Sequence, residues 1–157
     1  MKKIFKVTWY SDRVEYTLNG KPHRVDGPAV EWNNGTKQWY LYGLPHRENG
    51  PAMENVNGDK IWCLNGKRHR ENGPAIEFAD GSKYWYFYDC RHRIDGPAEE
   101  DREGNKFWYL HGKLHRVDGP AIEYASGKKE YWVDGKHLKI ITNDRMLVCF
   151  LKYGFLK

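Results

Sequence analysis

The chain of 157 residues has 26 basic and 21 acidic side chains, a formal net charge of +5, and a hydrophobic content of 39%. This length fits one domain, and no stretch approaches the ~20 apolar residues of a membrane-spanning helix, so we expect no membrane span. The interleaved charges permit nucleic-acid binding without indicating it. Three irregularly spaced cysteines, Cys63, Cys90 and Cys149, favour a reducing, cytoplasmic location.

Residues 1–15 precede a regular pattern and follow it only loosely. Trp9 falls in phase with Trp32, and Leu18-Asn19-Gly20 matches Leu41-Tyr42-Gly43 one repeat later. We therefore predict that residues 1–15 form an N-terminal cap strand.

A His-Arg pair then recurs every 23 residues through the middle of the chain. A fixed period of this size is the signature of a repeat architecture, so residues 16–137 are predicted to form five to six repeats of a single domain spanning 1–157. The pairs are His23-Arg24, His46-Arg47, His69-Arg70, His92-Arg93 and His115-Arg116.

Each repeat reads as two short antiparallel strands joined by tight turns. The first strand is aromatic, as in Trp39-Tyr40-Leu41-Tyr42, and ends at a Gly, often as Asn-Gly, which favours a hairpin turn. A Gly-Pro-Ala step follows His-Arg, and the second strand is Ala-x-Glu, closed by a turn such as Asp80-Gly81. One hairpin is not stable alone, but stacked hairpins bury each other's aromatics. We predict an all-β fold: an elongated, twisted antiparallel sheet of stacked 23-residue hairpins, with about ten to thirteen strands.

After Lys136 the pattern stops, and residues 138–157 are the most apolar stretch of the chain. The end of a solenoid exposes a strand edge that needs a cap or a partner. We predict that this tail is a C-terminal cap over the last repeat, or else that it pairs with a second copy as a homodimer. Helix and strand both remain open for Met146-Leu147-Val148-Cys149-Phe150-Leu151.

The segment Tyr109-Leu110-His111-Gly112-Lys113-Leu114-His115 resembles the MORN repeat, which also has a 23-residue unit with an aromatic, a Gly turn and a His. The likeness covers roughly residues 12–138. The chain departs from that pattern where Arg follows the His and where Gly-Pro-Ala occurs. This variant is similar to repeat proteins of bacteriophages and large viruses. The resemblance implies an interaction scaffold and carries over no catalytic residues.

The recurring columns are first explained by stacking. Equivalent histidines should lie roughly 10 Å apart, too far to share a zinc ion whose ligands sit ~2 Å away. We therefore expect structural histidines that pack on neighbouring rings and bond turn carbonyls, and neither a metal nor a cofactor. The structural tryptophans are Trp39, Trp62, Trp85 and Trp108.

Two further columns carry charge. The arginines could pair with the glutamate column or contact phosphates, and the lysines should lie at the sheet edge or form a nucleic-acid stripe. The glutamates are Glu31, Glu54, Glu77, Glu100 and Glu123, and the lysines are Lys37, Lys60, Lys83, Lys106 and Lys129.

Differences between repeats indicate either a partner-binding face or aromatic rings that merely cover the second face of the sheet or the terminal element. Trp39 and Leu41 should face one side of the sheet, whereas Gln38, Tyr40 and Tyr42 face the other, which varies between repeats. Exposed aromatics on a rigid sheet are typical of protein-binding hot spots, and the fourth repeat adds an acidic cluster. The predicted partner-binding residues are Tyr40, Tyr42, Tyr84, Tyr86, Tyr88, Phe107, Tyr109, Glu99 and Asp101.

No unique catalytic constellation is visible, because the same residues recur five times, so we do not expect an enzyme. We expect a non-enzymatic interaction module. The resemblance suggests a small phage protein in the host cytoplasm that binds and inhibits a host protein such as a defence factor. The alternative is a nucleic-acid-binding protein that uses the Lys and Arg columns and exposed tyrosines.

Overall fold

The computed structural model describes residues 3–138 and contains 22 strands and no helix in that range. The strands are β1 Phe5–Trp9, β2 Arg13–Leu18, β3 Lys21–Pro22, β4 Val30–Trp32, β5 Lys37–Gln38, β6 Tyr40–Leu41, β7 Leu44–Pro45, β8 Met53–Glu54, β9 Lys60–Ile61, β10 Cys63–Leu64, β11 Lys67–Arg68, β12 Ile76–Glu77, β13 Lys83–Tyr84, β14 Tyr86–Phe87, β15 Cys90–Arg91, β16 Glu99–Glu100, β17 Lys106–Phe107, β18 Tyr109–Leu110, β19 Lys113–Leu114, β20 Ile122–Glu123, β21 Lys129–Val133 and β22 Lys136–Leu138.

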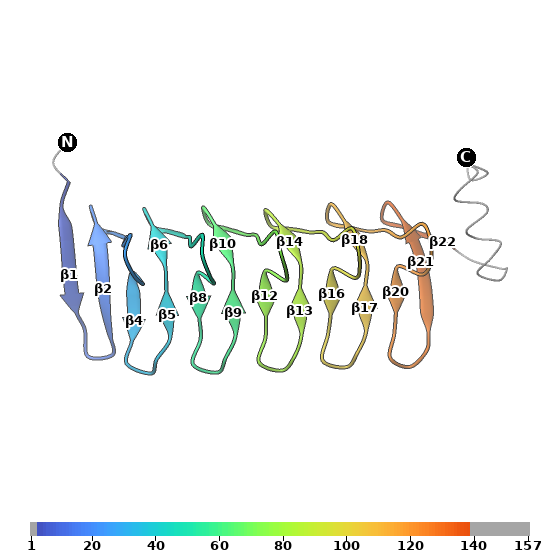
Figure 1. Cartoon of the computed structure of the whole chain (residues 1–157), viewed down its shortest axis with the longest axis horizontal. Coiled ribbons are helices and arrows are strands. Elements are labelled where there is room, and N and C mark those ends of the chain that lie inside the picture. Colours follow the sequence, from blue (N-terminus) through green and yellow to red (C-terminus); the bar gives the residue numbers. More distant parts are fainter. Residues whose placement is uncertain (1–2, 139–157) are drawn as a thin grey trace.

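Most strands belong to one long antiparallel sheet that runs along the array (Figure 1). Its order is β1-β2-β4-β5-β8-β9-β12-β13-β16-β17-β20-β21-β22, with β3 beside β2. Four separate hairpins line one long side, which we call the upper hairpins: β6–β7, β10–β11, β14–β15 and β18–β19. The predicted all-β sheet of stacked hairpin repeats is confirmed. None of the described residues forms a helix long and apolar enough to cross a membrane.

Each repeat contributes four short strands rather than the two predicted, because the ladder is interrupted at the aromatic column. The Trp39 N–H donates to Ala52 O (2.8 Å), and the His46 N–H donates to Trp39 O (3.0 Å). These bonds direct the chain out of the sheet and into an upper hairpin. It returns through a crossover loop, and the five crossover loops together form what we call the loop row: residues 23–29, 46–52, 69–75, 92–98 and 115–121.

The strand register defines two faces of the sheet, since residues directly opposite each other point the same way. On one face, here the charged face, glutamates and lysines alternate across ten strands, as in Glu54 opposite both Lys37 and Lys60. The predicted position of the lysine column at the sheet edge is therefore wrong. Each lysine lies within the ladder beside a carboxylate, because the two turns of the repeat bring the Glu and Lys columns into register.

The other face, here the variable face, holds a thin core. Ile76 and Tyr86 are buried there, with Ile61 and Tyr84 packed against them. The alanine of each Gly-Pro-Ala step is completely buried where the chain re-enters the sheet: Ala29, Ala52, Ala75, Ala98 and Ala121. No larger side chain among the described residues is buried to the same degree, so the fold depends on many partly covered contacts.

The N-terminal end of the sheet is the strand β1. β1 pairs with β2 over its full length, from Phe5 opposite Leu18 to Trp9 opposite Val14. Residues 139–157 lie outside the described residues. The predictions of a C-terminal cap, of a tail-mediated homodimer and of helix or strand in the tail stay predictions.

Candidate protein-binding surfaces

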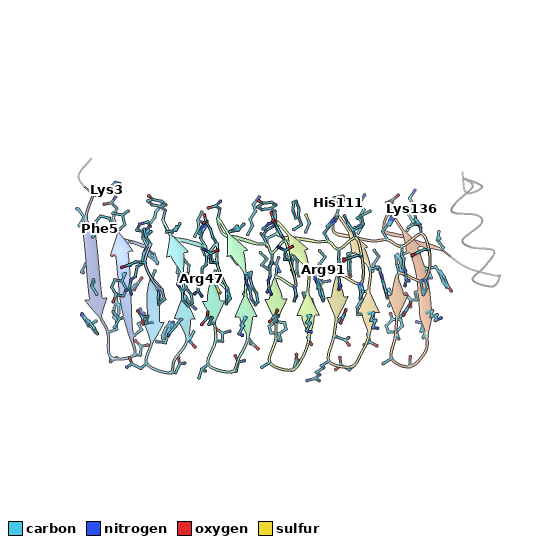
Figure 2. The ribbon with its side chains drawn as sticks, in the orientation of Figure 1. Lys3, Phe5, Arg47, Arg91, His111 and Lys136 are labelled. Atoms are coloured by element: carbon cyan, nitrogen blue, oxygen red, sulfur yellow. The ribbon has the colours of Figure 1, made fainter. Side chains whose placement is uncertain are left out.

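The histidine column joins each repeat to the next at the upper hairpin. The Nδ1 atom of His92 accepts a hydrogen bond from the backbone N–H of His111 (3.2 Å), and the two rings lie 4.5 Å apart. His111 stands at the tip of an upper hairpin (Figure 2). His23 does the same with Tyr42. The expected ring stacking occurs at His23, His69 and His92, whereas His46 and His115 face the side chains of Asn65 and Asp134. The expected bonds to turn carbonyls are wrong, because in four of the five repeats the tight turn directs a backbone N–H toward the imidazole.

The third repeat departs from this pattern. The His69 ring is 3% exposed and stacks on Tyr88 at 4.1 Å, and neither of its ring nitrogens has a hydrogen-bond partner in the described part of the chain. The turn that follows is Tyr88-Asp89, with φ angles of 48° and 67°, where other repeats place Gly at the second position. The Asp89 carboxylate accepts a hydrogen bond from Arg68 Nε at 2.7 Å, which ties this turn to the preceding hairpin.

The arginine column is held by three contacts that recur in each repeat. The guanidinium of Arg70 lies 3.9 Å from the centroid of Trp62, and its Nη1 donates to Pro74 O (3.1 Å) and to Glu77 Oε1 (2.7 Å). Gly73 packs against the same guanidinium, where an added Cβ would lie 3.0 Å from Cζ. The pairing of the Arg and Glu columns, one of two alternatives from the sequence, is thereby established (Figure 2 shows Arg47).

Between successive crossover loops lie four grooves, one per repeat step. The last of these, about 550 Å³, is lined by Trp108 and Leu110 and flanked by the tips Ile94 and Val117. The other three have volumes of about 610, 710 and 700 Å³ and equivalent linings. A Trp and an ion-paired Arg therefore recur in every groove, on a frame that is nearly identical from one repeat to the next.

The loop tips, defined as the residue after each His-Arg pair, are what differ. In the first, fourth and fifth loops the tip is aliphatic and exposed, namely Val25 (83%), Ile94 (86%) and Val117 (52%). The following Asp in those loops binds the Arg Nε, at 2.9–3.2 Å. For Asp26 this hydrogen bond from Arg24 lowers the carboxyl pKa. These tips are thus apolar with their local carboxylate already paired.

The second and third loops instead carry exposed acids, Glu48 and Glu71, followed by Asn. The Glu48 side chain is 78% exposed and its carboxylate lies 4.0 Å from His46 Nε2. The loop backbone differs as well, since Gly50 and Gly73 have φ angles of 147° and 145°. The loop row therefore presents an acidic section between apolar ones. The predicted binding residues did not include this position, because it is an unspecified residue in the 23-residue repeat pattern.

The predicted aromatic patch is arranged differently from the expectation. Tyr86 is 8% exposed, and Tyr40, Tyr84, Phe107 and Tyr109 are half-buried. Only Tyr42 and Tyr88 are well exposed, and both lie at hairpin tips against a histidine. The expected exposure of the whole row is therefore wrong, and arginines cover three of its rings, those of Tyr84, Tyr86 and Tyr109. Arg68 lies 4.1 Å from the Tyr86 ring centroid on one side.

Arg91 gathers several of the predicted residues around one charge. It donates to the hydroxyls of Tyr86 and Tyr109, each at 3.3 Å, and pairs with Glu99 at 3.0 Å. Burial raises the pKa of Glu99, and the Arg91 charge opposes that shift. The cluster satisfies its own charges, so it fits a stabilising role inside the variable face. The partner-binding role of these residues stays a prediction.

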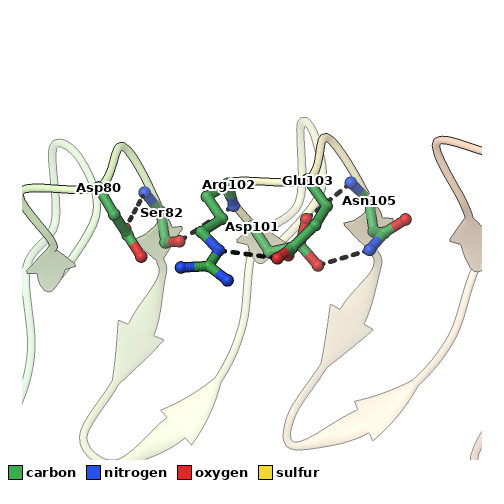
Figure 3. A network of polar contacts seen from close by, with 6 residues as sticks. All are labelled: Asp80, Ser82, Asp101, Arg102, Glu103 and Asn105. Carbon is green, nitrogen blue, oxygen red and sulfur yellow. Dashed lines mark hydrogen bonds and ion pairs between the residues drawn. The ribbon is translucent and has the colours of Figure 1, made fainter.

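The predicted acidic residue Asp101 belongs to a lower-turn network (Figure 3). It accepts bonds from the Asn105 backbone N–H (2.8 Å) and side-chain amide (2.7 Å), while Arg102 N–H donates to Ser82 Oγ (3.1 Å). The same type of bond links the other lower turns. In each case a backbone N–H of the next turn donates to the side chain that follows the turn glycine, namely Thr36, Asp59 or Asn105. Asp101 therefore organises its own turn.

In the described residues, no cluster of three or more metal-ligating side chains occurs. A comparison of the chain with models of known families and with curated protein sequences finds no match.

Proposed function

We propose that this chain is a non-enzymatic protein-binding scaffold whose loop row contacts the partner. The single observation that carries the proposal is a set of differing tips on an otherwise constant frame. His, Arg, Gly, Pro and Ala recur in all five loops, whereas the tips are exposed aliphatic residues in the first, fourth and fifth loops and exposed acidic residues in the second and third. Variation confined to the exposed positions of a rigid repeat is what a recognition surface requires.

The groove between the fourth and fifth loops is the best anchor site for such a partner. Ile94 and Val117 flank it, and Trp108 and Leu110 form its floor. Exposed apolar tips beside an aromatic floor resemble the core of a protein interface, with the ion-paired Arg93 and Arg116 at the rim. A partner side chain of moderate size fits a groove of about 550 Å³.

Nucleic-acid binding has less support from the same geometry. Each column arginine is paired with a glutamate, and each column lysine lies beside a glutamate in the ladder. Phosphate binding gains its affinity from basic groups that release counterions, and a basic group already paired with a carboxylate contributes little. This alternative predicts an affinity that falls steeply with salt.

The resemblance to repeats of phages and large viruses directs the partner search to a bacterial host, where the proposed action is inhibition of a host protein. The experiment is an affinity pull-down from a nuclease-treated bacterial lysate, read by mass spectrometry. The wild-type chain is compared with Ile94→Ser/Val117→Ser, with Glu48→Gln/Glu71→Gln, and with the control Val56→Ser, an exposed aliphatic in a lower turn.

We expect a stoichiometric protein that both the wild type and the control recover and that the loop-tip variants lose. Circular dichroism of each variant verifies the fold. Equal recovery by all four chains would place the contact elsewhere, and the absence of any protein partner for the folded wild type would contradict the proposal.

A further inference from the structure

The terminal strand β1 exposes an unusual number of apolar side chains. Phe5 is 66% exposed, Val7 47% and Trp9 76%. Within residues 3–138, no strand pairs with the outer edge of β1 (Figure 1), and Figure 2 shows Phe5 at that end of the array. An open edge with exposed aromatics is a template for a further strand.

The hydrogen bonds of β1 show which backbone groups are available at that edge. Asn19 N–H donates to Ile4 O, and Tyr10 N–H donates to Arg13 O, each at 2.8 Å. Backbone groups alternate in direction along a strand, so the even residues from 4 to 10 point toward β2. The N–H and C=O groups of Phe5, Val7 and Trp9 therefore point outward, unpaired by any described strand.

The side chains of these three residues share the charged face. Trp9 lies opposite Val14, and Val14 lies opposite Glu31. Lys6 and Thr8 point to the variable face. A new strand beside β1 would thus meet three apolar side chains on one face and Lys6 with Thr8 on the other.

The outer edge of β1 is complementary to the same edge of a second copy, if the two β1 strands run antiparallel and are centred on Val7. Val7 then lies opposite Val7 of a second copy, Phe5 lies opposite Trp9, and Lys6 lies opposite Thr8. Aromatic pairs across an antiparallel ladder are stabilising, and no like charges are directly opposed. The outward groups of Phe5, Val7 and Trp9 would also meet their counterparts in hydrogen-bonding register. A self-complementary patch of this kind is what a two-fold interface needs.

We propose that two copies of this chain pair through β1 to form one continuous antiparallel sheet. The two-fold axis stands perpendicular to the sheet, so the charged faces of both copies lie on the same side. The loop rows of the two copies would then present their tips to the same partner or to two equivalent ones. This inference uses the β1 edge only and stands independently of the proposed protein-binding function.

The test uses charge at the symmetry axis. Light scattering after size exclusion should give the wild type twice the 18.6 kDa chain mass. Val7→Lys and Val7→Glu each place like charges opposite each other and should be monomeric, whereas an equimolar mixture of the two should recover the dimer mass. The matched control is Val56→Lys, at a position 65% exposed in a lower turn, which should remain dimeric.

Hydrogen exchange supplies a second measurement that a folding defect would not imitate. In the wild type, the amides of Phe5, Val7 and Trp9 should exchange more slowly than in Val7→Lys, while those of Lys6 and Thr8 stay protected in both. A monomeric wild type would overturn the proposal, as would a Val7→Lys chain that keeps the dimer mass or a mixture of the two charge variants that stays monomeric.

Discussion

The substitution Arg70→Lys tests whether the arginine column holds the repeats together. Lysine keeps the charge but cannot stack its head on Trp62 while reaching both Pro74 O and Glu77. The stacking contact contributes roughly 1 kcal/mol and the charge-assisted bond to the carbonyl roughly 1.5 kcal/mol. The ion pair is about a third exposed, so solvent screening reduces its share to roughly 0.5 kcal/mol.

The expected loss of unfolding free energy is therefore about 2 to 3 kcal/mol, since lysine retains part of the ion pair. Urea unfolding followed by tryptophan fluorescence measures it. With a slope near 2 kcal/mol per molar urea, the midpoint should fall by about 1 to 1.5 M at an unchanged slope. The central repeat is suitable because it has a neighbour on both sides.

The matched control is Arg102→Lys. Arg102 is 65% exposed and pairs with Glu103 at the rim of a lower turn, so its loss should stay below about 0.5 kcal/mol. The double variant Trp62→Leu/Arg70→Lys should lose less than the sum of the single variants, by about 0.5 to 1 kcal/mol. Equal midpoints for Arg70→Lys and Arg102→Lys would refute the reasoning.

Three further predictions follow from local contacts. Burial, followed by the nearby His111, lowers the pKa of His92 below its ordinary value of 6.5. As the pH drops from about 6.5, the unfolded chain therefore binds the proton before the folded chain does, and the free energy of unfolding should fall. The variant His92→Gln should reduce this dependence of the free energy of unfolding on pH. Burial raises the pKa of the Cys63 thiol to about 11, so in a Cys149→Ser background a thiol reagent should label exposed Cys90 at once and Cys63 only on unfolding; rapid labelling of both would contradict this. Gly73→Ala should destabilise the chain by roughly 2 to 4 kcal/mol in urea unfolding, because the φ angle is 145° and the added Cβ would contact the Arg70 guanidinium. The control Gly81→Ala also has a positive φ, but its Cβ would lie in open space, so it should lose roughly 1 kcal/mol. Equal losses would show that the guanidinium contact is unimportant.

The candidate site was predicted from the sequence only in part. The register places Gln38 opposite Val30 and Met53, on the other face from the Glu and Lys columns, as alternation along the strand predicts. Alternation could not reveal that Tyr86 is buried. The burial of Tyr86 depends on contacts with Arg68 and Arg91, which directly precede the column histidines His69 and His92. The loop tips carried a signal in the sequence, since the residue after His-Arg is aliphatic in three repeats and acidic in two. The exposure of that residue is known only from the placement of the loops.

The sequence by itself determined the repeat and its turns, and it left open whether the arginine column pairs with glutamates or contacts phosphates. A strict 23-residue period places equivalent residues at equivalent positions, so a constant offset between Arg and Glu produces the same ion pair in each copy. Asn-Gly turns and Gly-Pro steps act locally, so they can be recognised without knowing their neighbours.

Only the tertiary structure decided which side chains are free. Burial depends on contacts between repeats, as when Tyr88 covers His69, and these contacts join residues about twenty positions apart. The availability of the β1 edge is a matter of hydrogen-bond parity, which the strand sequence does not encode. It follows from the pairing of Ile4 with Asn19 and of Tyr10 with Arg13, and that pairing directs the backbone of Phe5, Val7 and Trp9 outward.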